Sequence, residues 1–152
     1  MAEAILNKIG YPRFLGYSAG SHPRGRVNPL ATESLASMQY STKTLRSKSW
    51  MEFTSVISPS LDMVITVCDR AAAELCPIWQ GQPVKAHWSL PDPASVEGNH
   101  EVLLKAFTQV YQELERRIHY LLTLPIGPVD RDGIKAHLAD IESRFERKVR
   151  GK

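Results

Sequence analysis

Four stretches of the sequence place apolar residues every three or four positions, which is the spacing of an amphipathic helix. They are Met1 to Ile9, the segment that follows Asn28-Pro29, Glu101 to Leu122, and Asp130 to Arg150. The second of these has the clearest start, because asparagine is a favoured N-cap and proline suits the first helical position. We therefore predict four helices over these stretches.

Short runs rich in β-branched and aromatic residues alternate with the predicted helices. They are Phe14 to Ala19, Met63 to Val67 and Val84 to Trp88. The run Met63 to Val67 is apolar throughout, which is typical of a buried strand in a parallel sheet. Strands that alternate with helices are usually joined by right-handed crossovers. The pattern therefore predicts an α/β fold with a parallel sheet flanked by helices.

Two cysteines and one aspartate follow the predicted strands. Cys68 comes directly after the run Met63 to Val67, at the end of a strand where open α/β sheets bind their ligands. A helix-prone segment then leads to Cys76, and Asp92 lies in the polar loop after the strand Val84 to Trp88. We expect two thiols and one carboxylate to gather at one edge of the sheet.

The segment between the two cysteines must change shape if they are to form a disulfide. Eight residues of helix span about 12 Å, whereas the Cα atoms of a disulfide lie within about 7 Å of each other. The run Arg70 to Ala73 forms a helix readily but has few large side chains to anchor it, which suits a segment that unwinds. The alternative is that Cys68 and Cys76 are two unrelated structural cysteines, since cysteine is often simply buried.

Composition narrows the class of protein. A chain of 152 residues with 43% hydrophobic content suits one globular domain. A net charge of +3 without a dense Lys/Arg block argues against a nucleic-acid partner and equally fits a small anionic substrate. The two cysteines make no disulfide scaffold, and we find no secretory signal, no apolar stretch for a membrane and no metal-ligand spacing. We therefore expect a cytoplasmic protein without a bound cofactor, metal or membrane.

Several motifs in collinear order give the chain a family resemblance. They are M-A-E-A at the start, Y-S-A-G at 17–20, V-N-P-L-A at 27–31, V-I-T-V-C-D followed by C-P-I-W, and V-K-A-H-W-S-L-P-D-P-A. With these motifs the chain resembles arsenate reductases of the low-molecular-weight tyrosine-phosphatase type. Agreement of separated motifs in order is a stronger signal than one short pattern. We expect residues 1–124 to form this domain and 130–150 to form a C-terminal helix, either part of it or a tail.

The resemblance implies a three-layer α/β fold, in which a four-stranded parallel sheet has helices on both sides. In that family a C-x5-R loop between the first strand and the first helix holds the nucleophile. This chain contains no C-x5-R and begins at M-A-E-A, so we expect the first, interior strand and its loop to be missing. Our interpretation is a start codon placed too late. The alternatives are a truncated product and a dimer completed by strand exchange.

A missing interior strand has a physical consequence. Each backbone group left buried without a partner costs about 1–3 kcal/mol, and the backbone N–H groups that hold an oxyanion are lost. We therefore expect this form to be marginally stable and inactive toward arsenate on its own.

The resemblance also implies roles for the residues that are present. The family's loop cysteine attacks arsenate, the residue matching Cys68 attacks that adduct and expels arsenite, and the residue matching Cys76 resolves the resulting disulfide. External thioredoxin or a glutathione/glutaredoxin system would then reduce the Cys68–Cys76 bond. Asp92 matches a mobile-loop aspartate that would handle protons, although an ordinary Asp-Pro turn is the alternative.

Some relatives bind potassium beside the loop, through residues that match Glu3 and Ser18 and through a carboxylate. Lys48 stands at the carboxylate position here, so we predict an ammonium group in place of the ion and no potassium site. The alternative for Lys48 is a solvated surface lysine. His87 and Trp88 are expected to brace the loop rather than to react.

Two other functions remain open at this point. One is a low-molecular-weight phosphotyrosine phosphatase relative, against which the Cys68 and Cys76 pair argues, because phosphatase chemistry needs no resolving thiols. The other is a non-catalytic dithiol or interaction module, for example one that binds arsenite.

Overall fold

The computed structural model describes residues 1–74, 77–127 and 130–149. The chain divides into two compact units, each built from two separate stretches of sequence. We call the first the helical unit, Met1–Ser49 with Pro91–Leu122, and the second the sheet unit, Trp50–Leu90 with Thr123–Lys152. None of the helices in the described ranges combines the length and the apolarity needed to cross a membrane.

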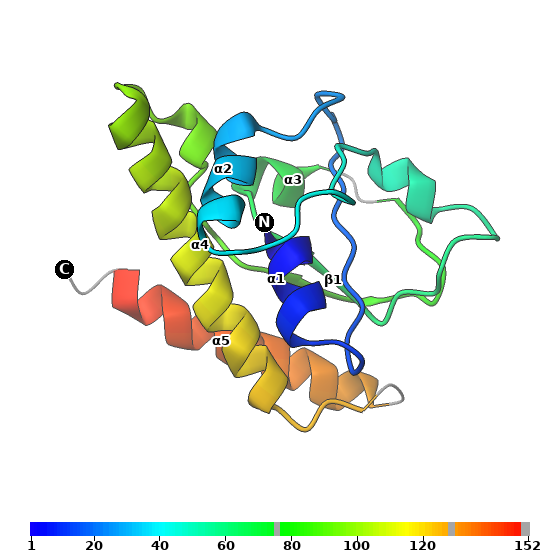
Figure 1. Ribbon diagram of the computed structural model, residues 1–152. Coiled ribbons are helices and arrows are strands. Elements are labelled where there is room, and N and C mark those ends of the chain that lie inside the picture. The colour runs from blue at the N-terminus through cyan, green and yellow to red at the C-terminus, as the bar shows by residue number, and fades with distance from the viewer. Residues whose placement is uncertain (75–76, 128–129, 150–152) are drawn as a thin grey trace. The chain divides into compact units, whose positions relative to one another are not determined.

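Three α-helices belong to the helical unit. They are α1 (Ala2–Ile9), α2 (Pro29–Ser37) and α4 (His100–Thr123), all labelled in Figure 1. A short 3-10 turn, η2 (Pro93–Ser95), precedes α4. The predicted start of α2 is confirmed, because the Asn28 side chain accepts a hydrogen bond from the Leu30 N–H at 2.9 Å. These three predicted helices are confirmed.

The apolar faces of these helices are buried as their spacing predicts. The buried side chains include Ile5, Leu35, Phe107, Val110, Leu114, Ile118 and Leu121. A polar cluster joins the helices at one point, where Tyr40 and Tyr111 meet edge to face with ring centroids 5.7 Å apart. Tyr111 donates a hydrogen bond to Glu115 at 2.5 Å, and the Lys8 ammonium lies 4.1 Å from the centre of the Tyr40 ring. Burial of Tyr111 and its contacts with Glu115 and Tyr40 raise the pKa of its hydroxyl.

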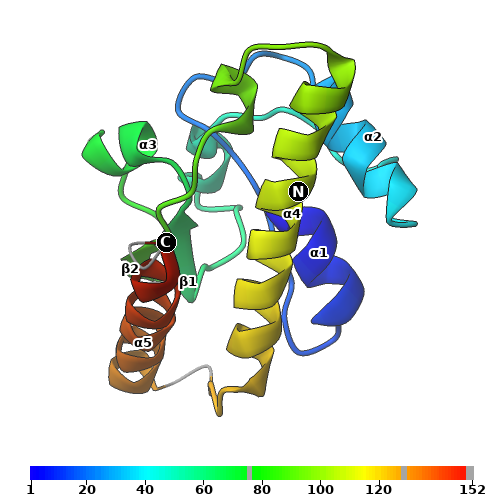
Figure 2. The ribbon, with the colours of Figure 1, turned by 90° about the vertical axis from the view of Figure 1, so that its left-hand side faces the viewer.

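The sheet unit contains two parallel strands, β1 (Met63–Thr66) and β2 (Val84–His87), paired from Met63↔Val84 to Thr66↔His87. The short helix α3 (Asp69–Ala73) follows β1 and contacts it, while α5 (Arg131–Val149) contacts β2 (Figure 2). A 3-10 turn, η1 (Trp50–Phe53), precedes β1. The predicted α/β class and parallel pairing are confirmed, and so is the C-terminal helix.

The predicted strand at Phe14 to Ala19 is wrong. These residues form irregular backbone, and the only pairing nearby in the described chain is an isolated parallel bridge between Gly20 and Ser49. A strand needs a neighbouring strand to pair with its N–H and C=O groups. Here the Asn7 side chain takes that place at Gly16, accepting from its N–H at 2.7 Å and donating to its C=O at 2.8 Å.

Strand β1 is less buried than its sequence predicts. All four of its residues are half-buried, and Val67, which follows, is 39% exposed. In a parallel ladder alternate residues turn their backbone groups to opposite edges. The pairing of β1 with β2 uses one edge only, and in the described ranges no strand pairs with the other edge. A run that reads as an interior strand is therefore found at the edge of a two-stranded sheet.

Candidate functional site

Cys68 lies where the sequence places it, just beyond the carboxyl end of β1. It is half-buried, and its backbone carbonyl accepts a hydrogen bond from the Ala72 N–H at 3.1 Å. This bond closes the first turn of α3, so the thiol-bearing residue is also the residue from which that helix begins. Any change in α3 therefore acts directly on the backbone of Cys68.

Helix α3 is short and weakly anchored by apolar side chains. It has five residues, and Ala72 and Ala73 are exposed. Ala72 also borders a cavity of about 340 Å³ whose other walls come from β1, β2 and Glu142 of α5. A short helix whose last two residues are exposed is a segment whose local opening should be easy.

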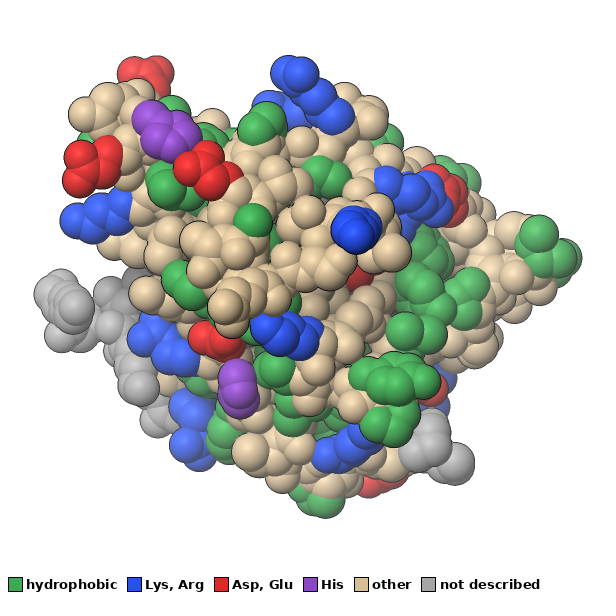
Figure 3. Space-filling model, viewed as in Figure 1, with side chains coloured by type: hydrophobic (Ala, Val, Ile, Leu, Met, Phe, Trp, Pro, Cys, Tyr) green, Lys and Arg blue, Asp and Glu red, His purple; other side chains and the backbone are tan. Residues whose placement is uncertain are grey.

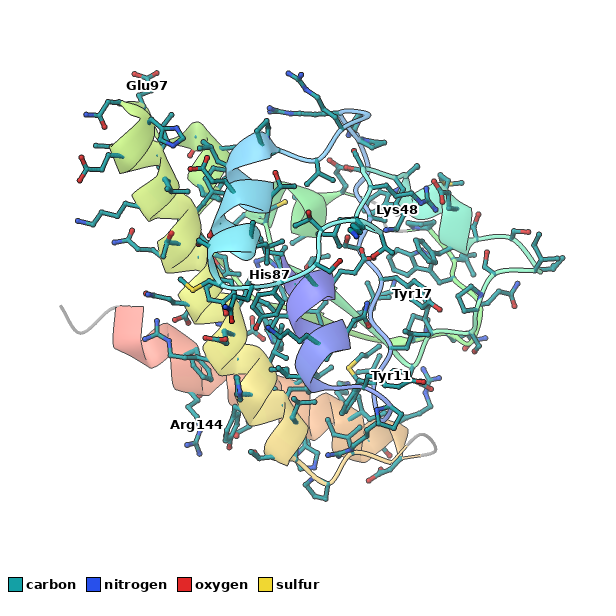
Figure 4. The ribbon with its side chains drawn as sticks, viewed as in Figure 1. Tyr11, Tyr17, Lys48, His87, Glu97 and Arg144 are labelled. Carbon is teal, nitrogen blue, oxygen red and sulfur yellow. The ribbon has the colours of Figure 1, made fainter. Side chains whose placement is uncertain are left out.

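A chain of hydrogen bonds connects the start of α3 to both strands. The ring of His87, labelled in Figure 4, lies with Nε2 3.0 Å from Asp69 Oδ1 and Nδ1 2.8 Å from the Thr66 hydroxyl. The Ser89 hydroxyl donates to the same Asp69 oxygen at 3.1 Å. We call this set the His87–Asp69 link. The hydrogen bonds from His87 and then Ser89 hold the pKa of Asp69 below its usual value.

Sequence reasoning assigned His87 a bracing role but did not find its partner. The signal was available in the strand pairing, because β1 and β2 end side by side at Thr66 and His87. The residues that follow each strand therefore meet at one edge of the sheet, and Asp69 is one of them. Trp88 is 2% exposed, in keeping with a bracing role.

The other two predicted site residues are placed differently. Cys76 lies outside the described residues, so its position relative to Cys68 stays a prediction. Asp92 belongs to the helical unit, where its carboxylate accepts from the Ala94 N–H at 3.0 Å and its carbonyl from the Ser95 N–H at 3.1 Å. Asp92 is thus the exposed N-cap of η2. The grouping of Asp92 with the thiols stays a prediction.

Glu3, Ser18 and Lys48 come together in the helical unit, as the family resemblance predicts. Glu3 Oε2 accepts from the Lys48 ammonium at 3.0 Å, from the Ser18 N–H at 2.9 Å and from the Ser18 hydroxyl. Lys48, labelled in Figure 4, is 6% exposed, so its interpretation as a solvated surface lysine is wrong. A positive charge therefore lies beside the oxygens of Glu3 and Ser18, where the resemblance implies a cation in some relatives.

Four further basic residues lie at the surface of the helical unit. Arg24, Arg26, Lys43 and Arg46 are all exposed. On the face drawn in Figure 3, the Lys and Arg side chains are scattered between other surface types.

Comparison with known proteins places the chain in a family. The profile of the family described as low molecular weight phosphotyrosine protein phosphatase matches residues 1–135. The chain belongs to this family. One curated relative, the arsenate reductase of Halalkalibacterium halodurans, is 30% identical over 118 residues, which are 78% of this chain and 81% of the relative.

Solved structures agree on the fold. An arsenate reductase in the reduced state superposes with a TM-score of 0.60, and an arsenate reductase in the oxidized state with a TM-score of 0.62. In both comparisons the identity is 23%, and the match covers 80% of this chain and 85% of the other. The fold expected from the resemblance is therefore confirmed.

Proposed function

We propose that this chain carries the thiol relay of an arsenate reductase, with Cys68 and Cys76 as the relay pair. The position of Cys68 carries the proposal: a half-buried thiol at the carboxyl end of β1, followed at once by the weakly anchored helix α3. The curated relative at 30% identity, itself an arsenate reductase, supports arsenate as the substrate.

The relay moves two electrons from thiols to arsenic in balanced steps. A nucleophilic thiolate first displaces hydroxide from arsenate and forms a sulfur–arsenic bond. The Cys68 thiolate then attacks that sulfur, so a disulfide forms, the sulfur–arsenic bond breaks and its electron pair leaves with arsenite. The Cys76 thiolate next attacks the Cys68 sulfur, releases the first thiolate and leaves a Cys68–Cys76 disulfide. An external thiol reductant, thioredoxin or glutaredoxin with glutathione, returns both thiols.

The first nucleophile of this sequence comes from outside the 152 residues, because they contain no C-x5-R. The open edge of β1 offers a position for a further strand, and strand exchange between two copies is one way to fill it. Light scattering at rising protein concentration tests the exchange. A monomer at every concentration would contradict it.

Asp92 is proposed to handle protons at the arsenate or at the departing thiol, in addition to its capping role. Substitution distinguishes the capping role from the proton-transfer role, because asparagine caps a helix as well as aspartate does but holds no acidic proton. Asp92→Asn should keep the stability and slow the turnover of the completed enzyme, whereas Asp92→Ala should lose both. Full turnover in Asp92→Asn would leave only the capping role.

The central test measures thiols and turnover together. The 152-residue chain, oxidised with one equivalent of peroxide, should lose two thiols and regain both with thioredoxin or with glutaredoxin and glutathione. Cys68→Ser and Cys76→Ser should each abolish this reversible pair. Arsenate turnover by the chain alone should be undetectable, and robust turnover would refute the claim that its nucleophile lies elsewhere. Two thiols that persist under the oxidant would refute the relay.

A phosphatase is the second candidate, because the family's description names one. Hydrolysis of an aryl phosphate requires no resolving thiol. Aryl phosphate hydrolysis that survives replacement of both cysteines by serine would therefore favour a phosphatase over the relay. A non-catalytic dithiol module would instead bind arsenite tightly and show no exchange with thioredoxin or glutaredoxin.

A further inference from the structure

We propose that His87, Asp69 and Ser89 are positioning residues that hold α3 in its helical form and so set the rate at which Cys76 reaches Cys68. This inference rests on the proposed relay and deepens it. It assigns to three side chains the control of the step in which the second thiol attacks the first.

The step requires the segment between the two cysteines to change shape if it is helical throughout, and α3 is the described helical part of that segment. The helix begins at the residue after Cys68, and its first turn is closed by the bond from the Ala72 N–H to the Cys68 carbonyl. A helix over the interval would keep the two Cα atoms about 12 Å apart, too far for a disulfide. The contacts of Asp69 with His87 and Ser89 lie at the start of the segment that must move.

The two alanines at the end of α3 contribute little apolar burial that would resist this opening. Ala72 and Ala73 are exposed, and the cavity of about 340 Å³ lies against Ala72. An alanine buries too little surface to hold a helix of five residues by itself. Among the described side chains of α3, Asp69 makes the polar contacts that join this helix to the end of β2.

The contact pattern of the ring makes the link depend on pH. When His87 is neutral, the Thr66 hydroxyl can donate to Nδ1 while the Nε2 N–H donates to Asp69. When the ring is protonated, Nδ1 can donate to the Thr66 carbonyl, which lies 3.1 Å away, and the positive ring also attracts the Asp69 carboxylate. Acid thus strengthens the link until Asp69 itself is protonated.

Other charged residues of the sheet unit line the same cavity as His87. Lys85, on the same strand, and Glu142, from α5, border the cavity together with His87. Glu142 adds a second negative charge and Lys85 one positive charge, so Asp69 remains the carboxylate in direct contact. Because a charged ring attracts the Asp69 carboxylate as well as donating to it, the opening of α3 should be slower at pH 6 than at pH 8.

A stoichiometric reaction with the aromatic disulfide 5,5′-dithiobis(2-nitrobenzoate) measures the step directly. The first protein thiolate breaks the reagent's disulfide, releases one coloured thiolate and forms a mixed disulfide. The second protein thiolate then attacks the protein sulfur of that bond and releases a second coloured thiolate. The slow second release reports ring closure, and it needs no arsenate, reductant or outside nucleophile.

We expect His87→Gln to speed the second release by about two- to fivefold at pH 6, as the loss of one partly exposed charged contact allows. The ratio of the variant's rate to the wild-type rate should be smaller at pH 8, where the neutral ring still donates to Asp69 but no longer adds its charge. Thiolate ionisation affects both proteins alike and cancels in this ratio. Asp69→Asn should behave in the same way, and Ser89→Ala should give a smaller increase that does not depend on pH.

His100→Gln is the matched control. His100 Nε2 lies 3.0 Å from Glu33 Oε1, so it makes an exposed pair of the same length, but in the helical unit. Its second release should equal that of the wild type at every pH. Circular dichroism shows whether each variant is folded. If His87→Gln does not fold, Ser89→Ala, the mildest change, still tests the positioning role.

The possible outcomes distinguish the positioning role of His87 and Asp69 from the thiol relay on which it rests. Equal second-release rates in the wild type, His87→Gln and Asp69→Asn would overturn the positioning role and leave the relay standing. A rate increase that is the same at pH 6 and pH 8 would reduce His87 to a structural residue and overturn the role as well. A wild-type chain with no second release would overturn the relay and this inference together.

Discussion

The helical unit and the β1–α3 region of the sheet unit are built in opposite ways. In the helical unit Ile5 and Leu35 are fully buried, and the Glu3–Lys48 ion pair is almost completely enclosed. In the β1–α3 region the strand is half-buried, two alanines of α3 are exposed and a cavity lies against the helix. The looseness is local, because Ile134, Leu138 and Ile141 of α5 are buried in the same unit.

This contrast suggests a division of labour. A relay that must bring a second thiol to the first needs a segment whose opening takes little free energy, whereas the rest of the chain must hold its shape meanwhile. Cys68, the cysteine proposed to react, lies next to the shortest α-helix of the described chain. Each of the following predictions would break or sharpen that comparison, beginning with the largest effect.

Lys48→Met should be the most damaging of these substitutions. It removes the ammonium from the enclosed Glu3 carboxylate and leaves a buried charge without its counter-charge. The expected loss in the free energy of unfolding is about 3–5 kcal/mol, measured by urea unfolding. Lys43→Met, at an exposed position, should change it by less than about 0.5 kcal/mol. Equal effects at the two positions would contradict the importance of the ion pair.

The effect of potassium on the melting temperature is a second test of the role of Lys48. The wild-type melting temperature should not differ between potassium chloride and sodium chloride of equal strength, because Lys48 already supplies the positive charge. Lys48→Asp restores the carboxylate that the family resemblance implies, so its melting temperature should rise in potassium relative to sodium. A potassium response in the wild type would contradict the predicted replacement of the ion.

A matched pair of isoleucines compares the packing of the two regions. Ile5→Ala, at a position with 0% exposure, should lower the free energy of unfolding by about 2–5 kcal/mol through lost burial and a residual cavity. Ile65→Ala, on half-buried β1, should lower it by about 1 kcal/mol. Chemical denaturation of both variants checks the difference. Equal losses would mean that β1 is packed as tightly as the helical unit.

The tyrosine cluster should make the helical unit sensitive to alkali. Tyr111→Phe removes the hydrogen bond to Glu115 and should reduce stability by about 1–2 kcal/mol at pH 7. Burial raises the pKa of Tyr111 in the folded state. Its contribution is therefore complete below the ordinary tyrosine pKa of about 10 and is lost as the pH rises above it. The difference from the wild type should shrink between pH 9 and pH 11, while Tyr11→Phe, at an exposed residue, should show no such trend.

Substitution of Asp69 should have the smallest effect of the series, and this effect should disappear at low pH. Its pKa is lowered in the folded state, so its contribution is complete above the ordinary aspartate pKa of about 4 and fades as the pH falls through the lower folded value. Amide hydrogen exchange of Ala72 should be faster in Asp69→Asn than in the wild type at pH 6, and the two should converge near pH 2. Asp62→Asn, an exposed aspartate before β1, should leave this exchange unchanged at both pH values.

Residues whose structure depends on near neighbours were predicted from the sequence. The period of the apolar positions predicted α4 and α5, and the Asn28-Pro29 pair predicted the start of α2, because caps and helical faces are local features. The failures depend on distant partners. Within the described residues, Phe14 to Ala19 has the composition of a strand but no neighbouring strand with which to pair, and β1 pairs with a strand on one side only.

In the candidate site, too, local features were predicted from the sequence and contacts between distant residues were not. The position of Cys68 after a strand was readable from the local sequence, and the contact of Glu3 with Lys48 followed from the family resemblance. The pairing of His87 with Asp69 depends on the register of β1 against β2, which no local pattern specifies. His87, which the sequence assigned only to bracing a loop, therefore contacts a residue that the sequence did not pair with it.

The one-sided β1 also has a consequence for handling the protein. A short, uncharged, β-branched segment with an available edge is a template on which other chains can add in register, as in amyloid growth. Asp62 and Asp69 flank the segment as charged gatekeepers, so acidification would remove their protection. Precipitation on storage at low pH, rather than loss of helix, should therefore be the first visible sign of damage.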